Sequence, residues 1–267
     1  MVGVKRFAAR YPIGVGVIGA VALIVGLVVF TGVAMGLLPE SEGRETVALT
    51  VARVVTALAT VALLWRLGWL RASGVARAGT WQVWLVTLGA TVYEILVALW
   101  AFFGSLRLDG VASLDALALP AAALTAGIVE EVVFRGAILY AFVRVWGNTR
   151  RGLFQSALLS AVLFGGLHAV NALFGKALPL ALLQILNATL SAVLYAALVL
   201  KGGSVWPIVF WHAALNAVVN LQVAATPGFE ETIPGSLLIV LFDLPLLAYG
   251  LLLLRRMPLR DVVPNVP

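Results

Sequence analysis

The sequence has no cysteine, few charged residues and only two histidines. Of its 267 residues, 62% are hydrophobic and 11% are charged, whereas about 25% are charged in soluble domains. The lack of cysteine excludes disulfides, thiolate metal sites and a cysteine nucleophile. The low charge indicates a polytopic membrane protein. The net charge of +6 is therefore no sign of nucleic-acid binding, because basic residues of membrane proteins collect in cytoplasmic loops.

Eight apolar runs are long enough to cross a bilayer as helices. The first follows a short basic segment and has no clear cleavage site. It is about twice as long as the apolar core of a signal peptide, so we read it as a membrane helix. The expected helices are 12–38, 46–65, 81–104, 117–146, 153–174, 178–200, 204–223 and 235–254. The sequence therefore predicts an all-α polytopic membrane protein with about eight transmembrane helices.

The basic residues fall mainly on one side of this predicted bundle. With eight spans, alternate loops share a side with both chain termini, and that side holds 13 of the 18 basic residues. They are Lys5, Arg6, Arg10, Arg66, Arg71, Arg77, Arg144, Arg150, Arg151, Lys201, Arg255, Arg256 and Arg260. The other side holds Arg44, Arg107 and Lys176. By the positive-inside rule, both termini are predicted to be cytoplasmic in a multi-pass protein of the plasma membrane. The Ala-, Val-, Leu-, Gly- and Arg-rich composition suggests a bacterial source.

Two adjacent carboxylates and a guanidinium interrupt the predicted helix 117–146. Each charge at the bilayer centre costs about 2.5–3.5 kcal/mol on insertion scales, so hydrophobicity does not explain them. Glu131 and Arg135 are four residues apart and are predicted to pair on one helix face. That pair alone could be a structural staple. Glu130 lies about 100° round the helix without a local partner, which leaves it for general acid or base chemistry.

Both histidines lie in later apolar runs. His168 ends the sequence Phe-Gly-Gly-Leu-His, whose two glycines predict the close approach of another helix. His212 and Asn216 are four residues apart and point the same way. A single histidine in an apolar helix is usually a core side chain. Two histidines, an asparagine and a glutamate pair at middle depths of three helices instead favour a reaction centre that binds zinc or activates water directly.

Three motifs resemble those of a known family. Glu-Glu-x-x-x-Arg at 130–135, Phe-x-x-x-His at 164–168 and His-x-x-x-Asn at 212–216 occur in this order on successive predicted spans. Together they resemble the CPBP group of CAAX prenyl proteases and bacteriocin-processing (Abi) proteins, which includes Ras-converting enzyme. The resemblance covers about residues 117–220. It implies eight membrane helices that enclose a polar conical cavity, and an endopeptidase that hydrolyses peptide bonds with activated water.

The resemblance also implies roles for the motif residues. Glu130 and His168 would position and deprotonate the water, and His212 and Asn216 would stabilise the oxyanion. An asparagine amide aimed at developing charge can contribute about 3–4 kcal/mol. Members are described both as metalloproteases and as metal-free glutamate proteases. Zinc held by Glu130, His168 and His212 is therefore left open as a cofactor.

The remaining motif residues, Glu131 and Arg135, would support the site. We expect the whole chain to be one membrane domain. Within it, 1–116 contains the first three helices, 117–223 the four helices of the catalytic core, and 224–267 the last helix and a cytoplasmic tail.

The expected partners are the lipid bilayer and a membrane-embedded or lipidated peptide or protein substrate. Two other functions are left open: a non-catalytic membrane scaffold or immunity protein on the same fold, and a proton-coupled transporter. Glu94 is expected to face the cavity or to pair with Arg53. Asp243 is expected to bind backbone groups freed by Pro245. The Arg-rich segment 66–80 is expected to be a cytoplasmic connector, which either lies along the membrane interface or is an ordinary positive-inside loop.

Overall fold

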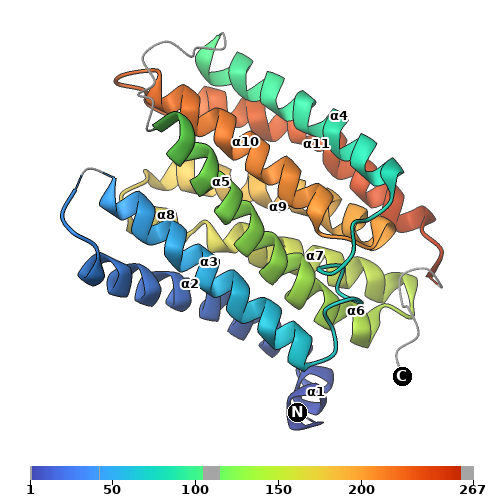
Figure 1. The fold of residues 1–267 in the computed structure, drawn as a ribbon. Helices are drawn as coiled ribbons and strands as arrows, with labels where there is room; N and C mark the ends of the chain where they lie inside the picture. The colour runs from blue at the N-terminus through green and yellow to red at the C-terminus, as the bar shows by residue number, and fades with distance from the viewer. Residues whose placement is uncertain (1, 42, 105–114, 260–267) are drawn as a thin grey trace.

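The computed structural model describes residues 2–41, 43–104 and 115–259 (Figure 1). These residues form α-helices and two π-helical segments, η1 and η2. The elements are α1 (Val2–Arg10), α2 (Pro12–Leu37), α3 (Arg44–Arg66), α4 (Trp81–Ala98), η1 (Leu99–Phe103), α5 (Asp115–Glu131), η2 (Val132–Leu139), α6 (Tyr140–Trp146), α7 (Arg150–Leu167), α8 (Val170–Leu173), α9 (Leu178–Gly202), α10 (Trp206–Ala224) and α11 (Ile233–Arg256). Arg107 and Arg260, which belong to the charge pattern above, lie outside the described residues.

Eight helical stretches of the described chain are long and apolar enough to cross a membrane. They match the eight predicted spans closely, and the longest, Leu117–Trp146, runs through α5, η2 and α6. Large apolar side chains such as Val25 and Val28 of α2 are more than half exposed on the outside of the bundle. Such a surface suits hydrocarbon rather than water. The chain is therefore an all-α, multi-pass membrane protein, as the sequence predicted.

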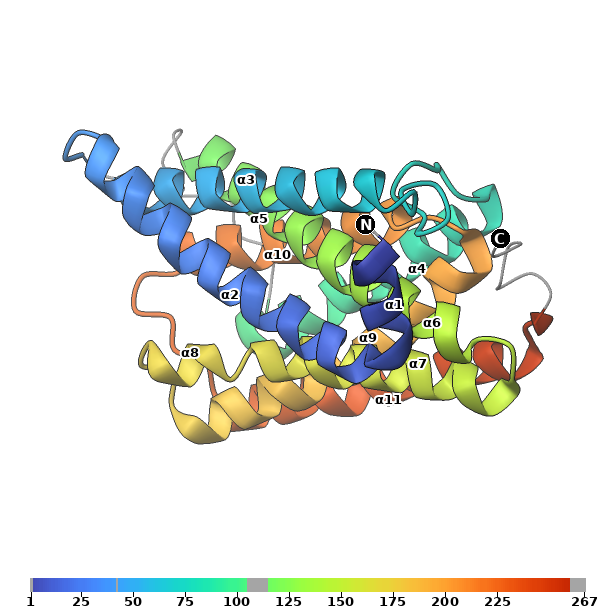
Figure 2. The same ribbon diagram turned by 90° about the horizontal axis from the view of Figure 1, so that it is seen from below.

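The spans are arranged in two layers. In one layer, α5 packs between α3 and α10, and in the other α9 packs between α7 and α11. Helix α2 contacts α3 and α7 along one edge, and α4 contacts α10, α9 and α11 along the other. Figure 2 shows the two layers with α2 crossing between them. The two layers are therefore joined at both edges, by α2 and by α4.

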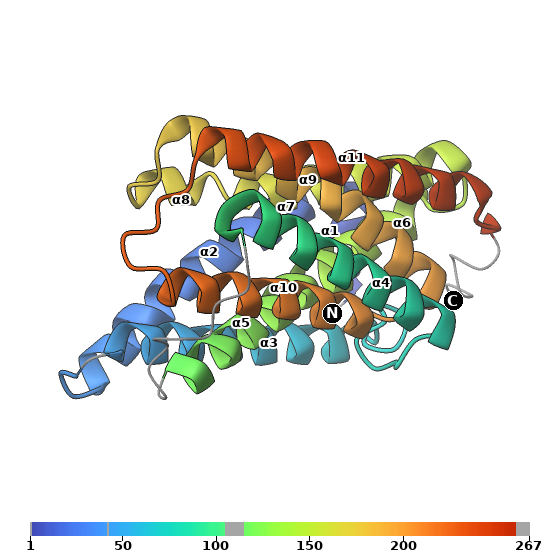
Figure 3. The same cartoon turned by 90° about the horizontal axis from the view of Figure 1, so that it is seen from above.

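The two ends of the bundle differ. The chain's N-terminus and the last described helical turn of α11 lie at the same end of the bundle (Figures 2 and 3). The α8–α9 and α10–α11 connections lie at the opposite end (Figure 3). This arrangement is the one expected for an even number of spans.

The segment 66–80 packs against the bundle. Its apolar side chains Leu67, Trp69 and Val75 are buried against protein. The indole N–H of Trp206 donates to the carbonyl of Val75 at 2.9 Å, and the Arg144 guanidinium lies 4.5 Å from the Trp69 ring centroid. Alternating arginine and apolar residues suit an interfacial segment, and the same pattern also suits a connector that folds back over helix ends.

The predicted helix 153–174 is broken at its histidine. Helix α7 ends at Leu167, His168 is its C-cap residue, and the short helix α8 follows at Val170. His168 therefore sits at a helix end rather than within a helix, with its backbone N–H bonded to the carbonyl of Gly165 at 3.0 Å. After α8, the chain reaches α9 through the turn 174–177.

The two glycines before His168 have different surroundings. A Cβ added at Gly165 would lie 1.9 Å from Thr189 Oγ1 and 2.7 Å from the carbonyl oxygen of Ile185, both on α9. A Cβ added at Gly166 would meet nothing within 4 Å. The predicted close approach of another helix is therefore confirmed at Gly165 and wrong at Gly166.

This difference gives a matched pair of variants. Gly165→Ala is expected to destabilise the protein by about 1–3 kcal/mol, because the new methyl group overpacks the α7–α9 contact. Gly166→Ala is expected to be neutral or stabilising by up to about 1 kcal/mol, because alanine is the better helix former. Denaturation of both variants in detergent micelles measures the two changes. Equal effects would show that α7 and α9 do not meet at Gly165.

Candidate active site

The ion pair predicted from sequence is present. Arg135 Nε lies 3.1 Å from Glu131 Oε2, and both side chains are almost fully buried. Glu131 is the last residue of α5, and Arg135 lies in the π-helix η2 that follows. π-helical turns inside α-helices are rare and are frequent at functional sites.

Aromatic rings surround the arginine. Its guanidinium carbon lies 4.1 Å from the ring centroid of Phe164 on α7 and 5.2 Å from that of Tyr195 on α9. A guanidinium in this position is attracted by the ring quadrupoles. The cation is therefore held by one carboxylate and two rings, which reduces the cost of its burial. The sequence did not predict the contact with Tyr195.

His212 connects the two carboxylates. Its Nδ1 lies 3.0 Å from Glu131 Oε1, and its Nε2 lies 3.8 Å from Glu130 Oε2. Because a carboxylate accepts, the first contact places a proton on Nδ1. Nε2 is too far from Glu130 for a direct hydrogen bond. Glu131 therefore does more than neutralise Arg135: it also fixes the orientation of His212, a role that helix spacing alone could not indicate.

Several buried polar atoms of the site lack a hydrogen-bond partner within the described chain: Glu130 Oε2, Glu131 Oε2 and the three guanidinium nitrogens of Arg135. Unlike the other two side chains, Glu130 has no ion pair closer than 3.8 Å with a described residue to compensate. Its Oε2 atom is inaccessible to solvent and makes no hydrogen bond to any described group. Glu130 also lies within electrostatic range of both His168 and His212. A buried polar atom left without a hydrogen bond is costly and often marks a functional position.

His168 approaches the site from the other layer. Its Nδ1 lies 3.1 Å from the carbonyl oxygen of Phe164. A carbonyl only accepts, so Nδ1 carries the proton and Nε2 of the neutral ring keeps its lone pair. The rings of His168 and His212 both pack edge-on against Phe164, with centroid separations of 5.3 and 5.9 Å. The two predicted histidines therefore meet around one aromatic ring.

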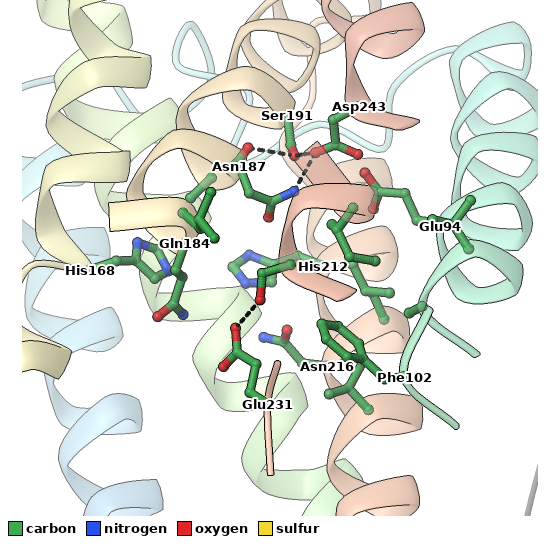
Figure 4. Close-up of a pocket in the computed structure, with 18 of the residues that line it drawn as sticks. Glu94, Phe102, His168, Gln184, Asn187, Ser191, His212, Asn216, Glu231 and Asp243 are labelled. Atoms are coloured by element: carbon green, nitrogen blue, oxygen red, sulfur yellow. Dashed lines mark hydrogen bonds between the residues drawn. The ribbon is translucent and has the colours of Figure 1, made fainter. Parts of the chain in front are cut away.

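A cavity of about 280 Å³ adjoins this cluster. His168, His212 and Asn216 line it, and Figure 4 shows their side chains around its space. The three predicted site residues of α5 and η2, Glu130, Glu131 and Arg135, are not among the lining residues, and Glu130 adjoins the cavity through His212. The structure thus brings the six predicted site residues into one region, with three at the cavity wall and three behind it.

A second polar cluster lies in the same cavity. Asp243 Oδ2 accepts hydrogen bonds from Asn187 Nδ2 at 2.6 Å and from Ser191 Oγ at 2.7 Å. Glu94 Oε2 accepts from the indole N–H of Trp211 at 2.6 Å. Both acids line the cavity (Figure 4).

These contacts decide two earlier expectations. Glu94 faces the cavity, and its hydrogen bond goes to Trp211. Arg53 instead donates to the carbonyl of Ala122 at 3.0 Å. Asp243 binds side chains of α9, so its expected contact with backbone near Pro245 is wrong. One signal could have found the cluster: the polar residues at 184, 187 and 191 repeat at helical spacing along an apolar helix.

The three side chains considered for zinc do not form a metal site. Nδ1 of His212 is hydrogen-bonded to Glu131, and Nε2 of His212 is 3.8 Å from Oε2 of Glu130. Within residues 2–41, 43–104 and 115–259, no group of three or more His, Cys, Asp or Glu side chains is placed to hold a metal ion. The description as a metalloprotease is therefore not supported.

The fold and the site define a multi-pass membrane protein with a carboxylate–histidine centre beside an intramembrane cavity. Residues 112–218 match the family described as "Type II CAAX prenyl endopeptidase Rce1-like". This segment contains all six predicted site residues. The resemblance to CAAX-type membrane proteases that the sequence motifs predicted is therefore confirmed over this segment. No match was found among curated proteins or solved structures.

Proposed function

We propose that the protein is an intramembrane endopeptidase in which Glu130 is the general base for a water molecule. The observation that carries the proposal is the chain of contacts Arg135–Glu131–His212–Glu130, which ends on a buried carboxylate oxygen without a hydrogen-bond partner. A water molecule bound to Glu130 Oε2 would supply the hydrogen bond that this buried oxygen lacks. The substrate is a membrane-associated peptide or protein.

The proposed first step is attack on the scissile carbonyl carbon. Glu130 takes a proton as the water oxygen forms its bond to carbon, and the carbonyl oxygen becomes an oxyanion. His168 assists because its Nε2 lone pair is available while Nδ1 is held by Phe164. Glu130 then passes the proton to the leaving amine as the C–N bond breaks.

The proposed oxyanion donors come from α10. In its imidazolium form, His212 donates Nδ1–H to Glu131 and has Nε2–H left for the oxyanion. Asn216 lies one helical turn further on and lines the same cavity. Donors fixed in place before the reaction stabilise developing charge without reorganisation. Glu131 and Arg135 are positioning residues in this scheme, because they act through His212.

The direct test is hydrolysis of a membrane-delivered peptide by the purified protein in liposomes, followed by mass spectrometry of the products. We expect one or a few defined cleavage sites. Substrate transport without hydrolysis would instead favour the proton-coupled transporter, and partner binding without hydrolysis would favour the scaffold.

Asn216 gives a further prediction with an internal control. Asn216→Ala is expected to reduce kcat by about 10²–10³-fold, the usual cost of losing one oxyanion donor. Asn220→Ala, one turn further along α10 and outside the cavity lining, is expected to change kcat little. Equal losses in the two variants would remove Asn216 from the oxyanion site.

A further inference from the structure

The cavity extends from the middle of the bundle toward one end. Its lining residues fall late in the α4–η1 span, in the middle of α10, in the early and middle parts of α9 and early in α11. The corresponding ranges are 94–102, 212–219, 183–195 and 236–243. Because successive spans run in opposite directions, these segments meet in the half away from the chain termini (Figure 3). The site is therefore closer to the α8–α9 and α10–α11 connections than to the termini.

Charged side chains form the rim of the cavity at that end. Lys176 Nζ lies 2.6 Å from Glu231 Oε2, so the residues before α9 are tied to those before α11. Glu231 also accepts from Ser236 Oγ at 2.9 Å. Beside this bridge, Phe229 stacks on Phe103 with a centroid separation of 4.8 Å. Both members of the ion pair are partly exposed and line the cavity. A charged, partly exposed rim is expected at the level of water rather than lipid.

The opposite end carries most of the basic residues. Arg150 begins α7 there, and Lys201 and Arg255 lie in the last turns of α9 and α11. At the rim end, Lys176 is paired with Glu231 and Arg44 with Glu40. An excess of Lys and Arg in short loops marks the cytoplasmic face of a membrane protein.

We propose that the cavity is reached from the extracytoplasmic face, past the Lys176–Glu231 bridge, and that the substrate is a peptide segment presented at that face. That a substrate enters the cavity rests on the proposed function. The direction of access is inferred separately, from the position of the cavity and from the charge of the two ends. A lipidated C-terminus on a cytoplasmic protein approaches the wrong end of the bundle.

The test uses two ends of a single helix in a chain that has no cysteine. Lys176 precedes α9 and Lys201 lies in its last turn, so K176C and K201C place one thiol at each end of the same span. Intact cells that express either variant are treated with a membrane-impermeant maleimide. We expect at least a tenfold greater labelling of K176C than of K201C, and equal labelling after permeabilisation. The reverse ratio would overturn the proposal.

A second measurement tests the path of the peptide. Each purified variant in detergent is compared before and after attachment of a bulky polyethylene-glycol maleimide. Cleavage is expected to fall at least tenfold on labelling of K176C and to stay unchanged on labelling of K201C. Full cleavage by labelled K176C would overturn passage at the rim. If the wild type cleaves no peptide, the proposed function fails, whereas the labelling of intact cells still decides which end faces outward.

Discussion

Glu130→Gln is expected to reduce peptide cleavage by about 10²–10⁴-fold, the usual contribution of a general base. The amide keeps the size of the side chain but cannot take the proton of the attacking water. Substrate binding should change little, because Glu130 lies outside the cavity lining. We therefore expect the loss in kcat rather than in KM, measured by product formation in liposomes.

The matched control is Glu230→Gln, which removes one carboxylate from an exposed loop position. It is expected to retain full activity. Full activity in Glu130→Gln as well would remove Glu130 from the reaction. If that variant kept a cellular phenotype without any hydrolysis, the protein would instead act as a scaffold or immunity protein on a protease fold.

The second large effect concerns the buried ion pair. Arg135→Met is expected to lower the free energy of unfolding by about 3–5 kcal/mol, because it leaves Glu131 as a buried charge without its cation. Methionine roughly preserves the volume between Phe164 and Tyr195, so the loss reflects charge more than packing. Denaturation of the detergent-solubilised protein measures the change.

A double variant separates charge from shape. Glu131→Gln combined with Arg135→Met removes both charges, and we expect it to be more stable than Arg135→Met alone. Its activity should remain low, because His212 has then lost the carboxylate that holds Nδ1. Additive losses of stability in the double variant would show that Glu131 and Arg135 are not coupled.

The sequence predicted features that depend on local spacing. The lengths of the apolar runs were sufficient to predict the eight spans. The four-residue spacing of Glu131 and Arg135 was sufficient to predict their ion pair. The contact between Glu131 and His212 joins residues 81 positions apart. Such a contact depends on how α5 and α10 are rotated about their axes, and apolar periodicity fixes that rotation poorly when helices are apolar on every side.

Other features were missed for related reasons. The end of α7 before His168 was not predicted, because the apolar run continues to Phe174 without a local stop signal. The partners of Asp243 lie on α9, more than 50 positions away in sequence, so the proximity of Pro245 gives no indication of them. The roles of Glu130, His168, His212 and Asn216 stay predictions, to be decided by the variants above.

The two layers of the bundle divide the site between them. Glu130 and Glu131 on α5 and His212 and Asn216 on α10 are carried by one layer, while His168 is carried by the other through α7. Sliding one layer against the other would change the distance from His168 to Glu130 while leaving the Glu131–His212 contact intact. The reaction centre is thus an assembly of two parts, and its competence depends on the alignment of helices whose contacts lie mostly outside it.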